Sequence, residues 1–313
     1  MVRPQLHTLI ERTDDYRPTS PRAIATSGTR IVVIGFRKLY ASNKLARFRL
    51  VGPKRPPVKL AAHDTGLLQF ENDLFVEGEE IWVCGYRGVA RSTNLGATFT
   101  VVPTPKGGPA TAGMPALTTI VRAHDGSVWA AGEHGNLLVC TGKQFRRVRG
   151  LDASAVLATT ACPLGILIAN AAGRLYIASA PDKIRRTTLD ARSPLHDVCV
   201  TPHQTIVAVG DGPSNQGAVY RSTDGGRSFE RGKLPTKKSV YTIAPFADGR
   251  LLAGGDEGIL LVSHDDGRSF ALLAPGGKRD RAPKREARAF NLACTYGDGV
   301  LIGGTCQGLQ HAV

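Results

Sequence analysis

The chain alternates between short apolar runs and glycine-containing turns, and one arrangement of the two recurs along its length. In one copy, the run Ile81–Gly85 is followed by a short turn and by a second run, Val89–Ser92. Short apolar runs bounded by glycine and polar residues are typical of buried β-strands. The sequence holds no helical periodicity of useful length, so the pattern predicts an all-β chain.

The first apolar run of each copy ends at an anchor position, which is glycine in most copies. The anchors are Gly35, Gly85, Gly132, Asn170, Gly210, Gly254 and Gly303. They lie about 45 residues apart on average, which is a repeat length of β-propellers with four short strands in each blade. Copies at that spacing account for all 313 residues. The sequence therefore predicts a seven-bladed β-propeller of four-stranded antiparallel blades, with residues 1–313 forming a single domain.

The strands of a unit and the closure of the array can both be predicted. In the third unit, strands are expected at 116–123, 127–132, 136–140 and 144–148. The last unit ends after its third strand, near Val313. The alternating segment at about 5–11 has no unit of its own, so we expect it to supply the missing outer strand and complete the last blade. An N-terminal strand in that place closes the ring and leaves few free sheet edges.

A polar turn after the third strand has the recurring sequence Ser-x-Asp-x-Gly-x-(Ser/Thr)-Phe, and we call its copies the Ser-x-Asp turns. Their defining residues are Ser222, Asp224, Gly226 and Phe229; Ser263, Asp265, Gly267 and Phe270; and, with Asn in place of Asp, Ser92, Asn94, Gly96 and Phe99. Residues 42–48 are interpreted as a shorter copy that follows an expected third strand at Leu39–Ser42, and 140–145 as one that lacks the Asp. The Ser and Asp oxygens can accept turn N–H groups, glycine permits a positive φ, and the aromatic side chain can return to the core. These properties predict a structural role.

The Ser-x-Asp turn resembles the Asp-box hairpin of the bacterial-neuraminidase-repeat propellers. The resemblance covers the repeats, and it implies that the turns are structural and lie on the rim away from the catalytic face of that family. It places the chain in a non-catalytic branch. Propellers that act as assembly factors are a looser resemblance, which implies a role in bringing other proteins together.

Catalytic chemistry has little support in the sequence. Sialidases of the Asp-box family open with a Phe/Tyr-Arg-Ile-Pro motif, and this chain has only Tyr16-Arg17-Pro18. A glycosidase needs two carboxylates across the scissile bond, and the expected inner strands offer Glu71, Asp73 and Asp197. The histidines show neither HxH nor HExxH spacing. We therefore expect no catalytic residue, no metal and no cofactor, with a sialidase-like glycosidase or glycan-binding propeller as the alternative.

Positive charge is the chain's strongest pointer to a partner. The sequence has 40 Lys and Arg against 26 Asp and Glu, a net charge of +14. In a propeller, the connections from one blade to the next share a face with the turns between second and third strands, and cationic residues concentrate in these segments. The expected partner-binding residues are Arg37, Lys38, Lys54, Arg55, Arg87, Lys237, Lys238, Lys278, Arg279, Arg281, Lys284 and Arg285. Such a face steers an acidic partner into place.

The favoured function is a non-enzymatic scaffold that binds an acidic protein in an assembly, accessory or toxin-immunity role. Nucleic acid is a second alternative, disfavoured because the basic loops hold almost no aromatic residues for base stacking. The first thirty residues contain no apolar signal segment, and the longest apolar run there is far shorter than the ~20 residues of a membrane span. The six cysteines are scattered without a CxxC pair, as expected for buried thiols in a reducing compartment. We therefore expect a cytoplasmic monomer that does not contact membranes.

Overall fold

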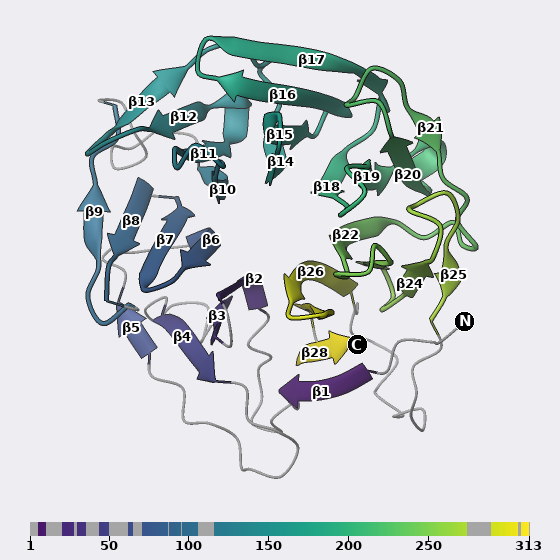
Figure 1. The fold of residues 1–313 in the computed structure, drawn as a ribbon, viewed down its shortest axis with the longest axis horizontal. Coiled ribbons are helices and arrows are strands. Elements are labelled where there is room, and N and C mark those ends of the chain that lie inside the picture. Colours follow the sequence, from purple (N-terminus) through teal and green to yellow (C-terminus); the bar gives the residue numbers. More distant parts are fainter. Residues whose placement is uncertain are drawn as a thin grey trace.

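The strands of the protein form seven four-stranded antiparallel sheets arranged around a central axis (Figure 1). The computed structural model of the chain describes residues 6–10, 21–27, 30–35, 44–49, 62–64, 71–86, 88–94, 96–105, 116–273, 289–305 and 308–312. Within these residues the only helical segments are two single 3-10 turns, η1 (Glu133–Gly135) and η2 (Pro213–Asn215). The predicted all-β architecture of four-stranded antiparallel sheets is confirmed.

We number the sheets 1 to 7 in the order of their first strands. Sheet 1 holds β2 (Pro21–Ser27), β3 (Arg30–Gly35), β4 (Lys44–Arg49) and β5 (Ala62–Asp64). Sheet 2 holds β6 (Glu71–Glu77), β7 (Glu80–Gly85), β8 (Gly88–Ser92) and β9 (Thr100–Val102). Sheet 3 holds β10 (Leu117–Arg122), β11 (Val128–Gly132), β12 (Leu137–Cys140) and β13 (Phe145–Val148). Sheet 4 holds β14 (Val156–Cys162), β15 (Gly165–Asn170), β16 (Arg174–Ala180) and β17 (Lys183–Asp190).

The remaining sheets follow the same order. Sheet 5 holds β18 (Leu195–Val200), β19 (Ile206–Asp211), β20 (Gly217–Ser222) and β21 (Glu230–Arg231). Sheet 6 holds β22 (Val240–Pro245), β23 (Leu251–Gly255), β24 (Leu260–Ser263) and β25 (Ala271–Leu272). Sheet 7 holds β26 (Ala289–Tyr296), β27 (Gly299–Thr305) and β28 (Gly308–Ala312), and its fourth strand is β1 (Leu6–Ile10), which pairs antiparallel with β28. The strands of sheet 3 match their predicted ranges to within one residue at each end.

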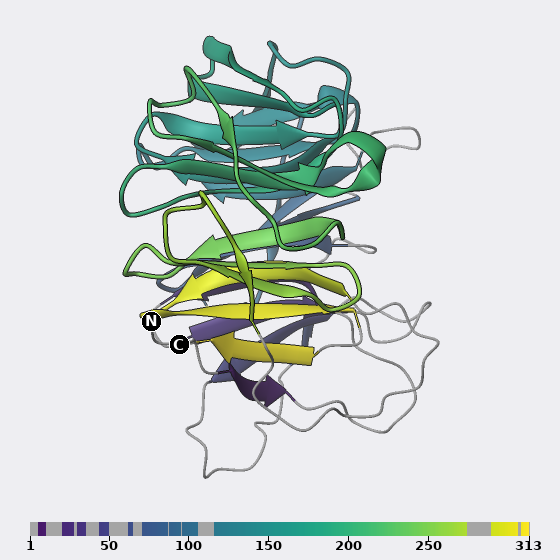
Figure 2. The same cartoon turned by 90° about the vertical axis from the view of Figure 1, so that its right-hand side faces the viewer.

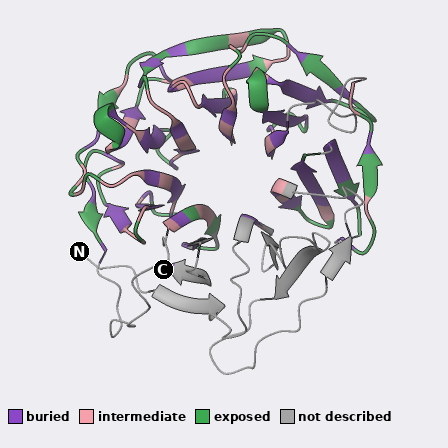
Figure 3. Cartoon of the chain, turned by 180° about the vertical axis from the view of Figure 1, so that it is seen from behind, coloured by how far each residue is buried: buried purple, intermediate pink, exposed green. Residues whose placement is uncertain are grey.

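The sheets pack face to face, and the core lies between neighbours. The first strands contact one another in sequence order, from β2 with β6 to β22 with β26, and β26 in turn contacts β2. A buried cluster between sheets 3 and 4 joins Trp129 and Val139 to Ile168 and Tyr176. Because both faces of a second strand are covered, β11 and β23 are apolar throughout and β7 is apolar after Glu80, unlike the alternating strands of a half-exposed sheet. The buried and exposed zones accordingly separate the inner strands from the outermost ones (Figure 3).

Every first strand carries a β-bulge at the same place. Its pairing with the second strand skips one residue near its N-terminal end, at positions 22, 72, 118, 157, 196, 241 and 291. A bulge leaves the skipped residue unpaired and changes the direction of its side chain. The repeat therefore presents one irregular position per sheet at the same end of the ring.

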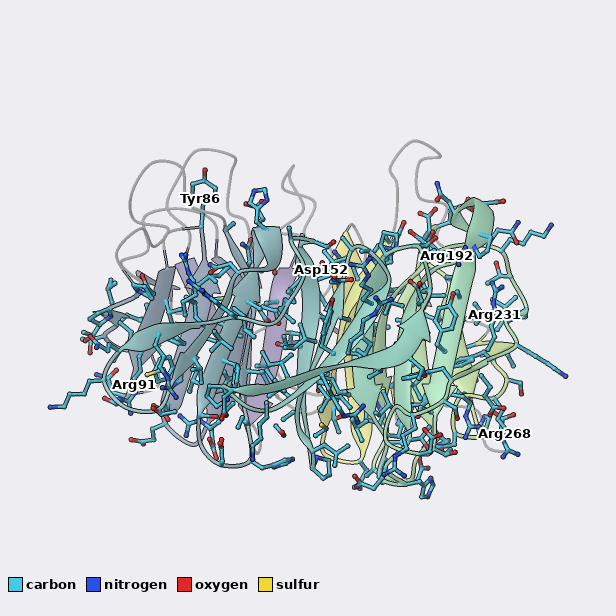
Figure 4. All side chains as sticks on the ribbon, turned by 90° about the horizontal axis from the view of Figure 1, so that it is seen from above. Tyr86, Arg91, Asp152, Arg192, Arg231 and Arg268 are labelled. Carbon is cyan, nitrogen blue, oxygen red and sulfur yellow. The ribbon has the colours of Figure 1, made fainter. Side chains whose placement is uncertain are left out.

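Connections leave the sheets at two ends, which we call the upper and lower faces. The upper face carries the turns between second and third strands and the connections from one sheet to the next, and the lower face carries the other turns. Tyr86 and Arg192 lie on the upper side and Arg268 on the lower side (Figure 4). In side view, connecting segments extend from both ends of the strands (Figure 2).

The third strand of the first unit lies further along the chain than predicted. The third strand was expected at Leu39–Ser42, but it is β4, Lys44–Arg49, which pairs with β3 through Leu45 with Ile34 and Phe48 with Ile31. The segment 42–48 is therefore not a shortened Ser-x-Asp turn. All six residues of 44–49 pair with β3, whereas the prediction followed the short apolar run that precedes them.

Candidate functional site

The predicted cationic residues fall mostly outside the part of the chain that the structure describes. Only Lys237 and Lys238 are described. Those outside are Arg37, Lys38, Lys54, Arg55, Arg87, Lys278, Arg279, Arg281, Lys284 and Arg285. The described strands nevertheless correct one assignment. Lys54 and Arg55 lie in sequence between β4 and β5, a third and a fourth strand, so the connection that contains them leaves β4 at the lower face and not at the predicted upper one.

Lys237 and Lys238 lie on the upper-face connection from sheet 5 to sheet 6. The carbonyl of Lys237 accepts the Gly217 N–H at 3.1 Å, and that of Ser239 accepts the Asp256 N–H at 3.0 Å, so the connection is held to the sheets on both sides. Lys238 forms an ion pair with Glu257 of the β23–β24 turn. Lys237 is exposed and pairs with no carboxylate in the described chain, so its charge is available to a partner.

His196 and Tyr241, two residues at β-bulges, form a cluster with Asp211 near the upper face. His196 Nε2 lies 3.0 Å from Asp211 Oδ2, and the rings of His196 and Tyr241 meet edge to face at a centroid distance of 5.1 Å. The other carboxylate oxygen, Asp211 Oδ1, is buried and has no hydrogen-bond partner from the described chain. Sequence reasoning missed this cluster, although a strict alignment of the repeat would have placed 196 and 241 at equivalent positions.

Asp152 forms a second polar cluster on the connection before β14. It accepts hydrogen bonds from Tyr176 Oη at 2.5 Å, Arg174 Nη1 at 2.7 Å and the Ser154 N–H at 2.8 Å. Burial raises the pKa of Asp152, but these hydrogen bonds outweigh it and hold the pKa well below its ordinary value. A carboxylate with so many donors stays ionised and fixes the connection in place.

The Ser-x-Asp turns have the geometry that their sequence predicts. In the sheet 5 copy, Ser222 Oγ accepts the Gly226 N–H at 2.9 Å and donates to Asp224 Oδ1 at 2.7 Å, which also accepts the Ser228 N–H at 2.9 Å. The sheet 6 copy repeats these bonds. In sheet 2, Asn94 Oδ1 accepts the Thr98 N–H, which is equivalent to the Ser228 N–H of sheet 5. Asn94 Nδ2 donates to Thr98 Oγ1, whereas an Asp at this position would accept a hydrogen bond.

The backbone and aromatic residues of these turns also follow the pattern. The glycines have φ values of +77° at Gly96, +81° at Gly226 and +84° at Gly267, a region that only glycine adopts without strain. Phe270 is buried, and Phe99 and Phe229 are partly buried. All of the predicted Ser-x-Asp residues are therefore brought together within their own turns.

The third-to-fourth turns also contact the preceding sheet, which the sequence did not indicate. In sheet 6, the Phe270 N–H donates to the Lys233 carbonyl at 2.9 Å, and the Lys233 N–H donates to the Arg268 carbonyl at 2.8 Å. The turn of sheet 5 is held by β17 of sheet 4. Arg185 Nη2 donates to the Gly225 carbonyl at 2.7 Å, and Thr188 Oγ1 donates to the Arg227 carbonyl at 2.9 Å. These turns thus join one sheet to the next at the lower face.

Two inner-strand carboxylates link neighbouring sheets and are not paired with each other by a hydrogen bond. Asp73 Oδ2 accepts the Ile120 N–H of sheet 3, and Asp197 Oδ2 accepts the Ile243 N–H of sheet 6, both at 2.9 Å. Burial raises the pKa of each carboxyl to about 6 despite these bonds. Their geometry ties them to the fold and not to a substrate.

These raised pKa values set the expected pH dependence of stability. Because the folded-state pKa of about 6 exceeds the ~3.9 of an unfolded Asp, each carboxyl stabilises the fold below pH 4 and loses that contribution as the pH rises through 6. We expect the free energy of unfolding to fall between pH 4 and 7, by up to about 3 kcal/mol per carboxyl. Asp197→Asn should flatten this slope in urea titrations, whereas the exposed control Asp182→Asn should leave it unchanged. An unchanged slope in Asp197→Asn would refute the assignment.

Within the described ranges, no group of three or more His, Cys, Asp or Glu side chains is placed to hold a metal ion. The same ranges contain no helix long and apolar enough to cross a membrane. Their cysteines are free thiols, and Cys84, Cys140, Cys162 and Cys199 are buried as predicted.

Comparison with known proteins identifies the fold. No protein-family model matches the chain, and no curated protein matches it. Among solved structures, virginiamycin B lyase from Staphylococcus aureus superposes with a TM-score of 0.71 at 14% identity, covering 99% of this chain and 98% of the lyase. YCF48 bound to a D1 peptide gives a TM-score of 0.66 at 14% identity, covering 100% and 97%. The WD40 β-propeller domain of Doa1 gives 0.68 at 9% identity, covering 98% and 97%.

The protein therefore has a β-propeller fold, as the spacing of its anchors predicted. At these identities the likeness extends to the fold alone. The three similar structures include an enzyme and a protein with a bound peptide, so the fold accommodates both kinds of function.

Proposed function

We propose that the chain is a single seven-bladed propeller, closed by β1, that acts as a non-enzymatic scaffold and binds an acidic protein partner on its upper face. One observation carries the proposal. Apart from Lys54 and Arg55, the predicted cationic residues fall, in sequence, between pairs of strands whose facing ends open on that face: β3 and β4, β7 and β8, β21 and β22, and β25 and β26. Cationic segments at one end of a rigid ring create a field that steers an acidic surface.

Two described features support this face as the binding surface. Tyr86, on the β7–β8 turn, is 48% exposed, and exposed tyrosine beside arginine is the composition that protein interfaces favour. Lys237 is exposed on a connection that hydrogen bonds hold to both neighbouring sheets. YCF48, a propeller of similar shape, has a bound peptide, which gives the fold a precedent for protein recognition. The role we propose is assembly, accessory or toxin-immunity binding by a cytoplasmic monomer.

Charge reversal on matched faces tests this function. We expect Lys237→Glu, Lys284→Glu and Arg285→Glu, combined in one variant, to weaken capture of acidic proteins from the source organism about tenfold at low salt. The control combines Lys143→Glu, Arg227→Glu and Arg268→Glu, which make the same change of charge at exposed lower-face positions. Quantitative mass spectrometry of captured proteins provides the readout. The proposal would be refuted if both variants lost the same amount of captured acidic protein, or if the wild-type protein captured no acidic proteins.

A ligand-binding or catalytic site is the second candidate, and the cluster of His196, Asp211 and Tyr241 favours it. A carboxylate that orients an imidazole, with a phenol against the ring, is an arrangement suited to proton transfer. The structure gives less support to a glycosidase, which needs two carboxylates on opposite sides of the scissile bond. The two inner-strand carboxylates, Asp73 and Asp197, instead accept main-chain N–H groups. Turnover of a fluorogenic glycoside panel that His196→Ala abolishes would favour this candidate over the scaffold.

A further inference from the structure

The outer rim of the ring has a cationic hollow between sheets 3 and 4. A cavity of about 520 Å³ lies between β13 and the β16–β17 turn, and Arg146, Arg147, Val148, Arg149, Pro181 and Asp182 line it. The three arginines are exposed on the outermost strand of sheet 3 and just beyond its end. The hollow lies on the outer rim, and none of the residues that line it belongs to the predicted upper-face set or to a cluster described above.

The hollow exists because sheet 4 has an unusually short turn. Ala180 pairs with Lys183, which leaves Pro181 and Asp182 as the whole connection between β16 and β17. In sheets 3, 5 and 6 the corresponding turn is longer, and it hydrogen-bonds to the sheet before it, as the Phe145 N–H does to the Pro103 carbonyl at 2.9 Å. Within the continuously described stretch 116–273, no hydrogen bond joins the sheet 4 turn to β13. The position that a turn covers in the other sheets is therefore open beside β13.

The arginines in the hollow lie close together and have no carboxylate partner among the described residues. By contrast, Arg91, Arg122, Arg174, Arg186, Arg221 and Arg250 each form an ion pair within the protein. Arg146, Arg147 and Arg149 form none among the described residues, and Asp182 is the single carboxylate that lines the hollow. Guanidinium groups bind carboxylates through two parallel hydrogen bonds, so three unpaired ones beside an open strand favour an acidic ligand.

The second recognition element is the free edge of β13. In sheet 3, β13 is the outermost strand and pairs only with β12, and the hydrogen bond from the Phe145 N–H to Pro103 occupies only the first residue of its outer edge. An extended peptide can add to such an edge through main-chain hydrogen bonds, as recognition by β-augmentation does. The lining residues include no aromatic side chain on which a nucleobase could stack, which favours a peptide over single-stranded nucleic acid.

We propose that this hollow binds an extended, acidic segment of a partner protein, which lies along β13 and pairs its carboxylates with Arg146, Arg147 and Arg149. The segment occupies the position that a third-to-fourth turn occupies in the neighbouring sheets. This rim site goes beyond the upper-face function, and either can fail without the other.

Fluorescence anisotropy with a labelled nine-residue peptide of three Glu-Glu-Val repeats, which places carboxylates on both faces of an extended strand, tests the site. We expect saturable binding that weakens at least about tenfold when Arg146, Arg147 and Arg149 are changed to Glu together. The lower-face control, Lys143→Glu with Arg227→Glu and Arg268→Glu, carries the same net charge and should keep most of the affinity, as should the upper-face variant. Asp182→Asn removes the one opposing charge and should tighten binding about two- to fivefold.

Three results would overturn the proposal. They are the absence of saturable binding by the wild-type protein, equal weakening in the rim variant and the lower-face control, and preferential binding of a fifteen-nucleotide oligo-dT at these arginines. A version of the peptide with N-methylated glutamates tests edge pairing, since it keeps the charges and loses main-chain donors. We expect it to bind at least about fivefold more weakly, and equal affinity would overturn pairing with β13. Urea unfolding of each variant confirms that the fold is retained.

Discussion

Replacing Gly210 by alanine is expected to lower the free energy of unfolding by about 3 kcal/mol. Gly210 is an anchor of the repeat. It lies near the end of β19, close to Pro194, the residue that precedes the first strand of the same sheet. A Cβ atom there would lie 2.1 Å from the Pro194 carbonyl oxygen, and equivalent collisions would arise at Gly132 and Gly255. Because the obstacle is main chain, relief requires the bulged start of β18 to move.

The matched control for this prediction is Gly142→Ala. Gly142 lies in the exposed turn after β12, and a Cβ atom there would have nothing within 4 Å. Its effect should stay within about 0.5 kcal/mol. Urea denaturation followed by tryptophan fluorescence measures both changes. If Gly210→Ala proves as mild as Gly142→Ala, the explanation of the repeated glycine is wrong.

Replacing Asp265 by alanine is expected to cost about 2 to 3 kcal/mol of unfolding free energy. The carboxylate accepts hydrogen bonds from Ser263 Oγ and from both the N–H and Oγ of Ser269, at 2.6 to 2.9 Å. The same turn holds sheet 6 against sheet 5 through Lys233 and Phe270. Loss of the carboxylate therefore weakens a turn and a contact between sheets.

Two variants distinguish this mechanism from a general loss of charge. Asp265→Asn should cost less than about 1 kcal/mol, because Asn94 makes the equivalent bonds in sheet 2. Asp182→Ala removes an exposed carboxylate from a turn in which no described hydrogen bond uses it, and should change the free energy little. Similar losses for Asp265→Ala and Asp182→Ala in thermal and urea unfolding would contradict the role given to the turn.

The sequence predicts the architecture well where one local pattern controls it. The same close main-chain contact recurs at Gly132, Gly210 and Gly255, so the spacing of these glycines follows the size of a unit. Gly255 lies one residue beyond the predicted anchor Gly254, and sheet 4 has Asn170 at the equivalent pairing position. In the first unit this reasoning failed, because the apolar run Leu39–Ser42 resembled a third strand while the more polar segment Lys44–Arg49 forms it. Local composition could not distinguish the two, since pairing with β3 decides between them.

The candidate sites were less predictable because they depend on contacts between sheets. His196 and Asp211 belong to one unit and Tyr241 to the next, and only the bulged register brings the rings together. Arg146 and Arg147 lie in the strand expected at 144–148, but the hollow beside them results from a short turn in the following sheet. The spacing of residues along the chain indicates neither the contact between the two rings nor the hollow beside β13.

The affinity of the purified protein for its captured acidic partner, measured between 50 and 300 mM salt, tests the central claim most directly. If the upper face is the binding surface, the upper-face variant should lose affinity and most of the salt dependence, while the lower-face control should keep both. Identical affinities and salt slopes for the two variants would contradict an upper cationic face as the site of recognition.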